Sequence, residues 1–407
     1  MTTTSTPPVP RREMTLVGAV VLAISVGAFF RVPLLPSIGA ELAMSAADLG
    51  LITTLFGVGR LVTDIPAGRM ADRIPPLRAL GLAGAILAAG SVAFAGAPSG
   101  TWVIVAAFAL GVASALANTT GMTYFGTAAP AARRGSSMAV FSAALLGGQA
   151  LGPMIGGLIG DLAGWRAGVA SAAAVGATVA LFGIASGRLR TQPRTAPPHG
   201  HGRHAGGASG APWLQRGLLY AVSFSLMLML GAMPQTLIPI IGDDRFALGA
   251  GSIGLALGLG GACRFLGALA GGRIADRVSR KASLVPGMAL CSAGVALLAV
   301  DLGVSGWVAS IVFLSLGSYG VSVSATMLAD HARGSGVGRR LGTYRFMGDI
   351  GLIAGPSLTG FLYERVSDRA AVLAVAGLLG LVALLCALLL HETRWLEAST
   401  TTAGSRA

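Results

Sequence analysis

The sequence predicts an all-α integral membrane protein with 12 transmembrane helices, arranged as two pseudo-symmetric six-helix bundles. Three observations lead to this prediction. Charged residues make up only 11% and hydrophobic residues 54% of the 407 residues, whereas soluble proteins carry about 25% charged residues. The mean hydropathy is +0.74. Apolar stretches long enough to cross a bilayer recur along the chain, and one segment occurs twice.

The repeated segment indicates that the chain arose by duplication. Residues 50–73 read GLITTLFGVGRLVTDIPAGRMADR and residues 254–277 read GLALGLGGACRFLGALAGGRIADR, with ten identities in 24 positions at an offset of 204. The offset is half the chain length, so residues separated by it occupy equivalent positions in two halves of one ancestral unit. Duplicated halves built from apolar helices are typical of secondary transporters, in which the substrate site lies between the halves.

The predicted spans are apolar stretches of about 20 residues, enough to cross a hydrocarbon core of about 30 Å at 1.5 Å per residue. The first stretch is too long for a signal-peptide core and leads directly into another span. The 61 glycines suit the close helix packing found in bilayers. The spans are expected to begin near Thr15, Ala47, Ala79, Thr101, Ser136, Arg166, Gln215, Gly251, Ala282, Gly306, Leu341 and Arg369.

The net charge of +13 follows the topology and does not indicate a nucleic-acid partner. With a cytoplasmic N-terminus, 21 of the 29 Lys and Arg residues fall in cytoplasmic segments, 4 in external loops and 4 in spans. This positive-inside bias places both termini in the cytoplasm. We therefore expect a multi-pass protein of the plasma (cytoplasmic) membrane that functions as a monomer and has the lipid bilayer and a small-molecule substrate as partners.

A polar break separates the two predicted bundles. Residues 187–214 are rich in Pro, Gly, Arg and His and lack periodicity, which is typical of a flexible linker. Its His199, His201 and His204 are interpreted as solvated linker residues. The predicted organisation is a cytoplasmic N-terminal tail at 1–13, a six-helix bundle at 14–186, a cytoplasmic linker at 187–214, a second six-helix bundle at 215–391 and a cytoplasmic C-terminal tail at 392–407.

The sequence gives no indication of enzyme chemistry or of a bound metal or cofactor. Cys263, Cys291 and Cys386 fall inside predicted spans without ligand spacing, so they are interpreted as core thiols. The spans contain no nucleophile–base constellation, and the G-x-x-x-x-G-K-[ST] loop of nucleotide-driven pumps is absent from the sequence. We expect a transporter with no cofactor, driven by the proton gradient.

The loops after spans 2 and 8 carry a duplicated motif. GRMADRIPPLR (68–78) and GRIADRVSRK (272–281) resemble the loop motif G-x-x-x-D-R-x-G-R-R/K of the major facilitator superfamily. In physical terms the glycine permits close packing at a helix end, the aspartate caps or meets a helix N-terminus, and the arginine binds carboxylates or headgroups. The resemblance implies a cytoplasmic gate that opens and closes during alternating access. The matching residues are Gly68, Asp72, Arg73, Gly272, Asp276, Arg277, Arg280 and Lys281, while Pro75, Pro76 and Ser279 depart from the pattern.

Span 5 contains a second motif of the same superfamily. Its residues Gly148, Gly152, Pro153, Gly156 and Gly157 match the antiporter motif G-x-x-x-G-P-x-x-G-G. Proline bends the helix and the glycines form a smooth face for a tight crossing, so a packing groove alone is the alternative interpretation. The resemblance points to the 12-helix drug/proton antiporters of the superfamily, and hence to efflux. Span 11 repeats the motif as Gly351, Gly355, Pro356, Thr359 and Gly360.

Ionisable residues inside spans are costly, so they mark candidate functional positions. Arg60–Asp64 in span 2 and Arg345–Asp349 in span 11 are both spaced i, i+4, which permits intrahelical ion pairs. By the resemblance, spans 2 and 11 face each other, and the four residues form a network near the cytoplasmic gate. Asp64 and Asp349 are the two acids well inside spans, so either is a candidate for proton coupling.

Two further arginines lack an acid in their own helix. Arg264 is equivalent to Arg60 in the repeat, but Ala268 occupies the position of Asp64. Arg264 is therefore expected to be the arginine most available to an anion. Arg31 lies near the outer end of span 1 and is expected to reach the interface. Residues 101–132 lack the arginine that antiporters of this kind typically carry in span 4, and many of them have an acid in span 1, where this chain has Arg31.

Three functions remain open after these observations. The preferred one is proton-coupled efflux of small organic molecules by alternating access, with protonation of Asp64 or Asp349 as the coupling step. The alternative is uptake or exchange of a small organic or inorganic anion held by Arg60 and Arg264. A remote alternative is a non-transporting membrane receptor or sensor. The candidate substrate-binding residues are Arg264, Arg60, Arg31, Asn118, Gln149 and Gln235.

Overall fold

The structure is a computed structural model that describes residues 11–128, 134–186, 213–330 and 337–392, in which every element is helical. Residues 187–212 of the predicted linker, including its three histidines, and most of both predicted tails lie outside these residues, whereas Trp213 and Leu214 of the predicted linker already belong to a helix. Packing divides the chain into two compact units. Unit 1 comprises residues 1–44, 55–200 and 248–261, and unit 2 comprises residues 45–54, 201–247 and 262–407. Each unit thus contains most of one half of the sequence and the beginning of one helix from the other half.

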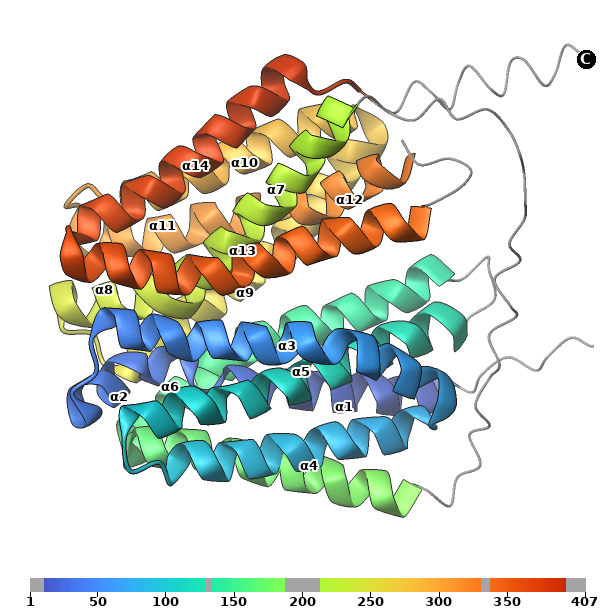
Figure 1. Cartoon of the computed structure of the whole chain (residues 1–407), viewed down its shortest axis with the longest axis vertical. Coiled ribbons are helices and arrows are strands. Elements are labelled where there is room, and N and C mark those ends of the chain that lie inside the picture. The colour runs from blue at the N-terminus through green and yellow to red at the C-terminus, as the bar shows by residue number, and fades with distance from the viewer. Residues whose placement is uncertain (1–10, 129–133, 187–212, 331–336, 393–407) are drawn as a thin grey trace, which may run out of the picture. The chain divides into compact units, whose positions relative to one another are not determined.

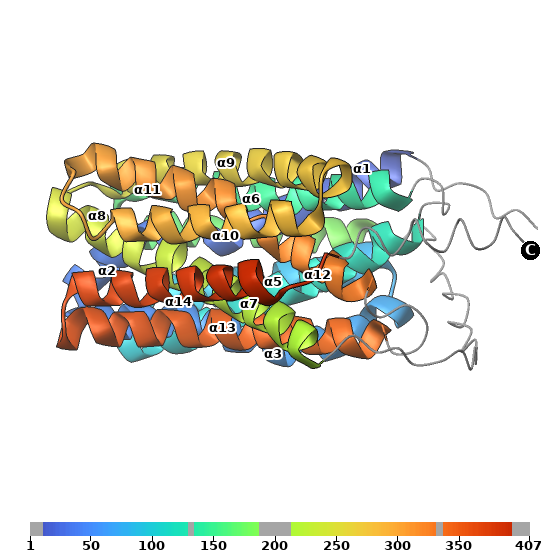
Figure 2. The same cartoon turned by 90° about the horizontal axis from the view of Figure 1, so that it is seen from above.

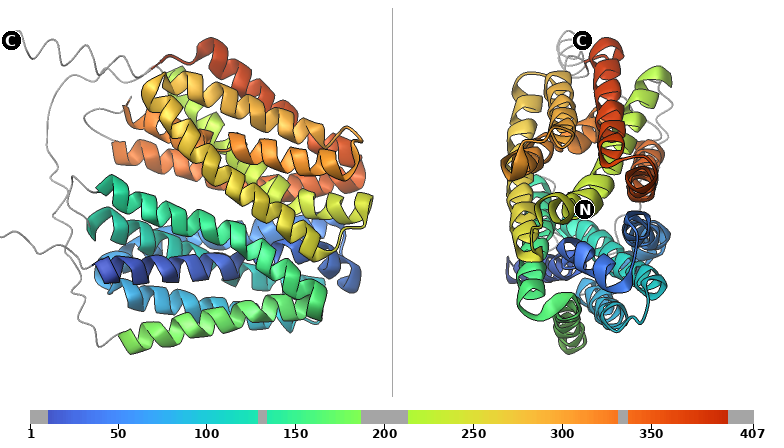
Figure 3. Two further views of the ribbon diagram at one scale, coloured as in Figure 1. Left: turned by 180° about the vertical axis from the view of Figure 1, so that it is seen from behind. Right: turned by 90° about the vertical axis from the view of Figure 1, so that its left-hand side faces the viewer.

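Unit 1 contains the helices of the first half, in which α4 and α1 pack along α6 (Figure 1). The longest of them, α6, reverses direction at Gly164, whose φ of 83° is a conformation that favours glycine. Figure 3 shows the two arms of α6 in green. The elements are α1 (Arg11–Phe29), η1 (Val32–Leu34), α2 (Leu35–Leu42), α3 (Ala46–Arg73), α4 (Pro76–Ala95), α5 (Gly100–Ala128) and α6 (Arg134–Ala185).

Unit 2 contains the helices of the second half. In it α7 packs along α13, and α10 packs on α11 and α14 (Figure 2). Cys263, Cys291 and Cys386 are buried free thiols, as predicted. The elements are α7 (Trp213–Ala232), the π-helical η4 (Met233–Leu237), α8 (Ile238–Phe246), α9 (Ala250–Arg277), α10 (Arg280–Leu297), α11 (Gly303–Gly317), α12 (Gly320–Asp330), α13 (Val337–Arg365) and α14 (Asp368–Leu389).

Nine helical stretches among the described residues are long and apolar enough to cross a membrane. One of them, Ser136–Ala185, contains the reversal at Gly164 between the predicted spans 5 and 6. Helices α10 and α13, the predicted spans 9 and 11, are not among the nine because polar and charged residues lower their hydropathy. The multi-pass helical architecture is confirmed, and the number of twelve spans stays a prediction.

The duplication extends to the backbone conformation. Ala43 follows α2 with a φ of 49°, and Ala247 follows α8 with a φ of 50°. Both alanines end their helix in the left-handed conformation, which is uncommon for a residue other than glycine. They occupy equivalent positions of the sequence repeat, so the same offset also relates these short helices of the two halves.

In unit 1 Arg166 of α6 connects the C-terminal end of α4 to the C-terminal end of α2. Arg166 donates to one carboxylate oxygen of Glu41 at 3.0 and 2.9 Å, and to the carbonyl oxygens of Ala95 at 2.7 Å and Ala97 at 3.1 Å. It therefore satisfies carbonyls at the C-terminus of α4 that have no partner within the helix. A cation in this position also interacts favourably with the helix dipole.

Unit 2 contains an equivalent ionic interaction, in which the arginine and the acid have exchanged helices. Arg245, the equivalent of Glu41 in the repeat, donates to Asp368 at 2.9 Å and to the carbonyl oxygen of Leu298 at 2.8 Å, just beyond the end of α10. The arginine now comes from α8 and the acid from the start of α14. The two halves thus preserve the ionic interaction while the residues that supply it have diverged.

The antiporter motif forms two tight crossings in unit 1. A Cβ atom added at Gly148, Gly152 or Gly156 would lie within 2.6 Å of atoms in or just after α1. A Cβ at Gly157 would lie 2.2 Å from the carbonyl oxygen of Ala250 at the start of α9. The smooth glycine face predicted from the sequence is confirmed, and the motif serves two neighbouring helices at once.

Unit 2 repeats this arrangement with α13. A Cβ at Gly351 would lie 2.2 Å from the carbonyl oxygen of Phe224 in α7. A Cβ at Gly360 would lie 2.6 Å from the carbonyl oxygen of Ala46 at the start of α3. Because Ala46 and Ala250 occupy equivalent positions of the repeat, the two units contain the same crossing with the halves interchanged.

The N-termini of the two crossed helices are capped differently. Ser45 and Asp48 cap α3 from within, since the Asp48 carboxylate accepts from the Ser45 amide at 3.0 Å and the Ser45 hydroxyl accepts from the Asp48 amide at 3.2 Å. In α9 the corresponding residues are Gly249 and Ser252. There Asp161 of α6 accepts from the Gly251 amide at 2.9 Å, so another helix of unit 1 supplies the cap.

We expect Gly157→Ala and Gly360→Ala to lower the thermal unfolding midpoint of the purified protein, because each new Cβ would collide with a backbone carbonyl. Gly377→Ala is the matched control, since its Cβ would meet no atom within 4 Å. Helical Gly→Ala substitutions otherwise stabilise by about 0.5–1 kcal/mol. A midpoint that is unchanged or raised in all three variants would contradict the tight crossings.

Arg245→Ala is expected to cost more stability than Arg166→Ala. The side chain of Arg245 is 21% exposed and that of Arg166 is 41% exposed, so solvent screens the second ion pair more strongly. Hydrogen bonds to charged groups contribute about 1.5–3 kcal/mol when sheltered. Thermal unfolding in detergent measures both variants, and a larger loss for Arg166→Ala would refute this ranking.

Candidate functional site

The charged pair predicted within α3 is not formed. Arg60 donates from Nη1 to the Ser114 hydroxyl at 3.0 Å, and Asp64 accepts from the Thr119 hydroxyl at 3.2 Å. Both partners belong to α5, so the prediction of an intrahelical Arg60–Asp64 ion pair was wrong. An i, i+4 pair with the base before the acid is the weaker orientation. The hydroxyls of α5, which packs closely on α3, therefore replace it.

Close packing of α3 on α5 is what brings these hydroxyls within reach. A Cβ at Gly59 would lie 2.3 Å from the Phe108 carbonyl oxygen, and a Cβ at Gly111 would lie 2.0 Å from that of Phe56. Gly59 and Gly111 are small residues in the predicted spans 2 and 4, so the sequence did indicate positions where helices could pack closely. Which hydroxyls they would bring to Arg60 and Asp64 depended on the register of the two helices.

The second half has no acid at the corresponding point. Ala268 takes the place of Asp64 and lines a cavity of about 100 Å³ with Ser322 and Val323 of α12. Arg264 is half-buried in α9 and has an interaction partner. Its availability to an anion stays a prediction.

Arg31 lies in a different environment from the one predicted. The side chain is 1% exposed, so the expectation that it reaches the membrane interface was wrong. Its guanidinium carbon lies 4.2 Å from the centre of the Phe56 ring. Helix α1 ends at Phe29, and the turn before Pro33 in η1 directs residue 31 into the packed interior of unit 1.

All three guanidinium nitrogens of Arg31 lack a hydrogen-bond acceptor among the described residues. A buried donor without an acceptor costs about 1–3 kcal/mol, and a charged donor costs more. The cation–π contact with Phe56 offsets about 2 kcal/mol at a desolvated site. Arg31 is therefore a buried cation whose hydrogen-bonding capacity is unused in this structure.

Gln235 occupies the position equivalent to Arg31 in the second half, in the π-helical segment η4. Its side-chain Nε2 donates to the Leu230 carbonyl oxygen at 3.2 Å. Its backbone carbonyl oxygen accepts from the Thr53 hydroxyl at 3.1 Å within unit 2. Its side-chain Oε1 is buried without a donor among the described residues. Single π-helical turns frequently occur at functional sites.

The remaining predicted site residues are less informative. Asn118 is half-buried in α5, and Gln149 is half-buried in α6. In α13, Arg345 is exposed and Asp349 is half-buried. All three of Gln149, Arg345 and Asp349 have interaction partners. The Arg345–Asp349 pair and the four-residue network with Arg60 and Asp64 stay predictions.

The predicted packing and capping roles of the gate motifs are not confirmed. A Cβ at Gly68 or Gly272 would meet no atom of the described chain within 4 Å, so these glycines do not mark a close approach. Asp72 and Asp276 have exposed side chains, as do Arg73 and Arg277. Neither aspartate caps the helix that follows it, and the role of the two motifs as a cytoplasmic gate stays a prediction.

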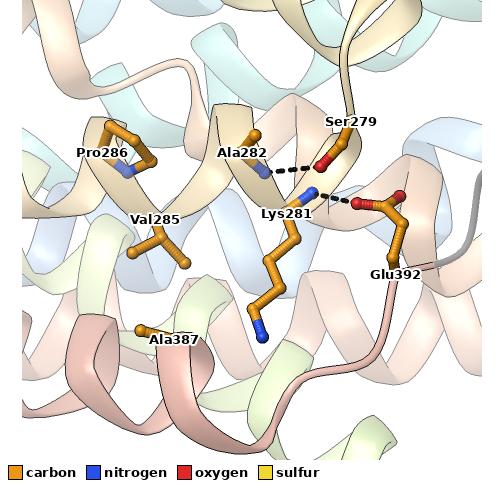
Figure 4. A pocket seen from close by; sticks show the side chains of 7 residues that line it. All are labelled: Ser279, Lys281, Ala282, Val285, Pro286, Ala387 and Glu392. Carbon is orange, nitrogen blue, oxygen red and sulfur yellow. Dashed lines mark hydrogen bonds between the residues drawn. The ribbon is translucent and has the colours of Figure 1, made fainter.

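Other groups cap the helix after the second motif. The N-terminus of α10 is capped by Ser279, which accepts from the Ala282 amide at 2.9 Å, and by Glu392, which accepts from the Lys281 amide at 3.0 Å (Figure 4). Glu392 also accepts from the Arg280 amide at 3.2 Å. A cavity of about 490 Å³ is lined by Ser279, Lys281, Ala282, Val285, Pro286, Ala387 and Glu392. No residue predicted to bind substrate lines this cavity.

Comparisons with known proteins agree with this architecture. The fold is similar to that of a bacterial homolog of the human lysosomal transporter Spinster in an inward-facing and occupied conformation, with a TM-score of 0.76 at 14% identity over 94% of this chain and 97% of that chain. A POT family transporter in complex with a thioalcohol-conjugated peptide gives a TM-score of 0.75 at 12% identity over 93% and 96%. At these identities the likeness shows the fold.

Two curated relatives match part of the chain. The class G tetracycline resistance protein of Vibrio anguillarum is 32% identical over 143 residues, which are 34% of this chain and 36% of the relative. The class C tetracycline resistance protein of Escherichia coli is 30% identical over a match of the same length. The chain therefore spans little more than a third of the length of these relatives.

The sequence profile described as Major Facilitator Superfamily matches residues 15–262 and 219–403, nearly the whole chain. This match agrees with the two sequence motifs, the helical fold and the duplicated crossings described above. The chain belongs to the Major Facilitator Superfamily of multi-pass membrane transporters.

Proposed function

We propose that the protein is a proton-coupled exporter of small organic molecules that works by alternating access. It would act as a monomer in the cytoplasmic membrane, with both termini in the cytoplasm and the proton gradient as its driving force. The antiporter motif in α6 and the partial similarity to tetracycline resistance proteins support export. The distribution of Lys and Arg along the sequence supports the orientation.

The state of Asp64 carries the proposal of proton coupling. Its carboxylate is half-buried in α3, accepts a hydrogen bond from Thr119 and forms no ion pair with Arg60. An acid that is not held in an ion pair can gain and lose a proton without separating two opposite charges. Asp64 is therefore the preferred coupling residue, and Asp349 is the second candidate.

A second function is favoured by the state of Arg60. Its Nη1 donates to Ser114, its Nε is buried without an acceptor among the described residues, and Asp64 does not neutralise it. A positive charge of this kind suits the binding of a small organic or inorganic anion, which would make the protein an anion carrier that uses Arg60 and Arg264. This function remains the alternative to proton-coupled efflux.

Asp64→Asn is expected to abolish substrate-driven proton flux while leaving the protein folded, because the amide keeps the shape and the Thr119 contact but cannot take up a proton. The measurement uses liposomes that contain a pH-sensitive dye, an imposed proton gradient and a panel of cationic, neutral and anionic compounds. Asp349→Asn tests the second candidate in parallel.

Asp161→Asn is the matched control for this experiment, because Asp161 caps α9 from α6 and is not assigned to proton transfer. We expect it to retain proton flux. Wild-type flux in both Asp64→Asn and Asp349→Asn would exclude these acids as coupling residues. Absence of proton flux from the wild type with every compound would overturn the proposed proton coupling.

Arg60→Gln separates the two functions. If the protein is an anion carrier, losing the guanidinium should reduce uptake of small anions at least about tenfold, the equivalent of about 1.4 kcal/mol. If it is a proton-coupled exporter, Arg60→Gln should leave substrate-driven proton flux in place. Ser114→Ala removes only the hydroxyl partner of Arg60 and serves as the control for local disruption.

A further inference from the structure

We propose that Arg31 is the specificity-determining residue for an acidic substrate, and that it binds the carboxylate of a molecule with an aromatic body. This inference rests on the proposed transport function and names the class of substrate. It starts from a buried cation that the structure leaves without an acceptor. Arg31 is 1% exposed, and its Nε and both Nη atoms have no hydrogen-bond partner among the described residues.

A structural role would have given Arg31 acceptors within unit 1, as Arg166 shows. Arg166 satisfies its nitrogens with Glu41 and two backbone carbonyls. The acids nearest to Arg31 in the sequence are committed elsewhere, since Glu41 binds Arg166 and Trp165, and Asp48 caps α3. The described residues of unit 1 therefore contain no acceptor that satisfies Arg31.

The geometry of the guanidinium selects the kind of acceptor. Its Cζ lies over the Phe56 ring, 4.2 Å from the ring centroid, and the N–H groups lie in the plane of the guanidinium in a fixed fork. The N–H fork of an arginine fits the two oxygens of a carboxylate with two parallel hydrogen bonds. Such a ligand neutralises the charge and satisfies the donors together.

The surroundings of Arg31 select the rest of the ligand. Phe29 meets Phe56 edge to face with their centroids 6.0 Å apart, and both rings are buried. The neighbouring Phe30 is 3% exposed. Aromatic groups at this position favour an aromatic or otherwise apolar body attached to the carboxylate.

The repeat supplies an independent indication that this position is used for recognition. Gln235, the equivalent residue of the second half, also has a buried polar side-chain atom without a partner among the described residues, and it lies in the π-helical segment of unit 2. The equivalent position of each half thus has a buried polar side chain with unused hydrogen-bonding capacity. Because Arg31 is almost fully buried here, a substrate would reach it only after the segment that follows α1 opens.

The test measures equilibrium binding to the purified full-length protein without any proton gradient. The probes are two matched pairs, 2-naphthoate with 2-naphthamide and dansylglycine with dansylglycinamide. We expect the wild type to prefer each acid over its amide by at least about tenfold, the change that one charge-assisted hydrogen bond supplies. Arg31→Met should abolish this preference, and Arg31→Lys should retain only part of it because lysine lacks the fork.

Thermal unfolding of the same variants separates recognition from structural support. Arg31→Met should leave the midpoint unchanged or raise it, since replacing an unpaired buried charge by an apolar side chain removes its desolvation cost. Arg369→Met, at an exposed arginine, is the matched control and should preserve both binding and stability. Because no gradient is applied, failure of proton coupling in the Asp64 experiment would leave this result intact.

The proposal is overturned if the wild type shows no preference for the acid in either pair, or if Arg31→Met keeps the preference. It is also overturned if Arg31→Met lowers the unfolding midpoint and weakens acid and amide equally, because Arg31 would then be a structural residue.

Discussion

Helix backbones approach each other closely at small residues, and these contacts position the polar side chains of the protein. In a bilayer the surrounding lipid is as apolar as the side chains, so helices associate through packing and not through removal of apolar surface from water. Gly157 against Ala250 and Gly360 against Ala46 bring two backbones into contact. The same kind of contact between α3 and α5 brings Ser114 to Arg60 and Thr119 to Asp64. The polar chemistry of the protein is therefore set by where glycine allows helices to meet.

The duplication preserves geometry more strictly than it preserves charge. The left-handed alanines and the crossing helices recur at equivalent positions of the repeat, whereas the ionic connection at the end of each bundle uses opposite signs in the two halves. The acid Asp64 has no counterpart in the second half, and Arg31 corresponds to Gln235. Residues that shape the backbone are thus retained in both halves, and so is the arginine at positions 60 and 264, while Asp64 and Arg31 have no like residue in the second half. The coupling and recognition residues that we propose therefore both belong to the first half.

The two principal candidate residues, Asp64 and Arg31, differ in how the protein supports them. Asp64 has one neutral partner, the Thr119 hydroxyl, and is half-buried. Arg31 is buried against the Phe56 ring, and its three guanidinium nitrogens have no hydrogen-bond acceptor among the described residues. Burying an unpaired charge costs free energy, and an anion that bound Arg31 would offset this cost. The proposed exporter would then recognise its substrate at one position of unit 1 and take up protons at another.

The helical membrane class, the duplication, the superfamily and the tight face of the antiporter motif could all be predicted from the sequence. These follow from composition and residue spacing, which depend on the chain alone. Which residues the charged side chains contact depends on the packing of the helices and could not be predicted. Arg60 and Asp64 were spaced for an ion pair, but the packing of α3 on α5 offered each a hydroxyl instead. Arg31 was expected at the interface, but the turn after α1 buried it. Gly68 and Asp72 matched a loop motif, yet the predicted close packing and helix capping are absent among the described residues. Spacing along a helix fixes which residues share a face, whereas the register of the neighbouring helix fixes what that face meets.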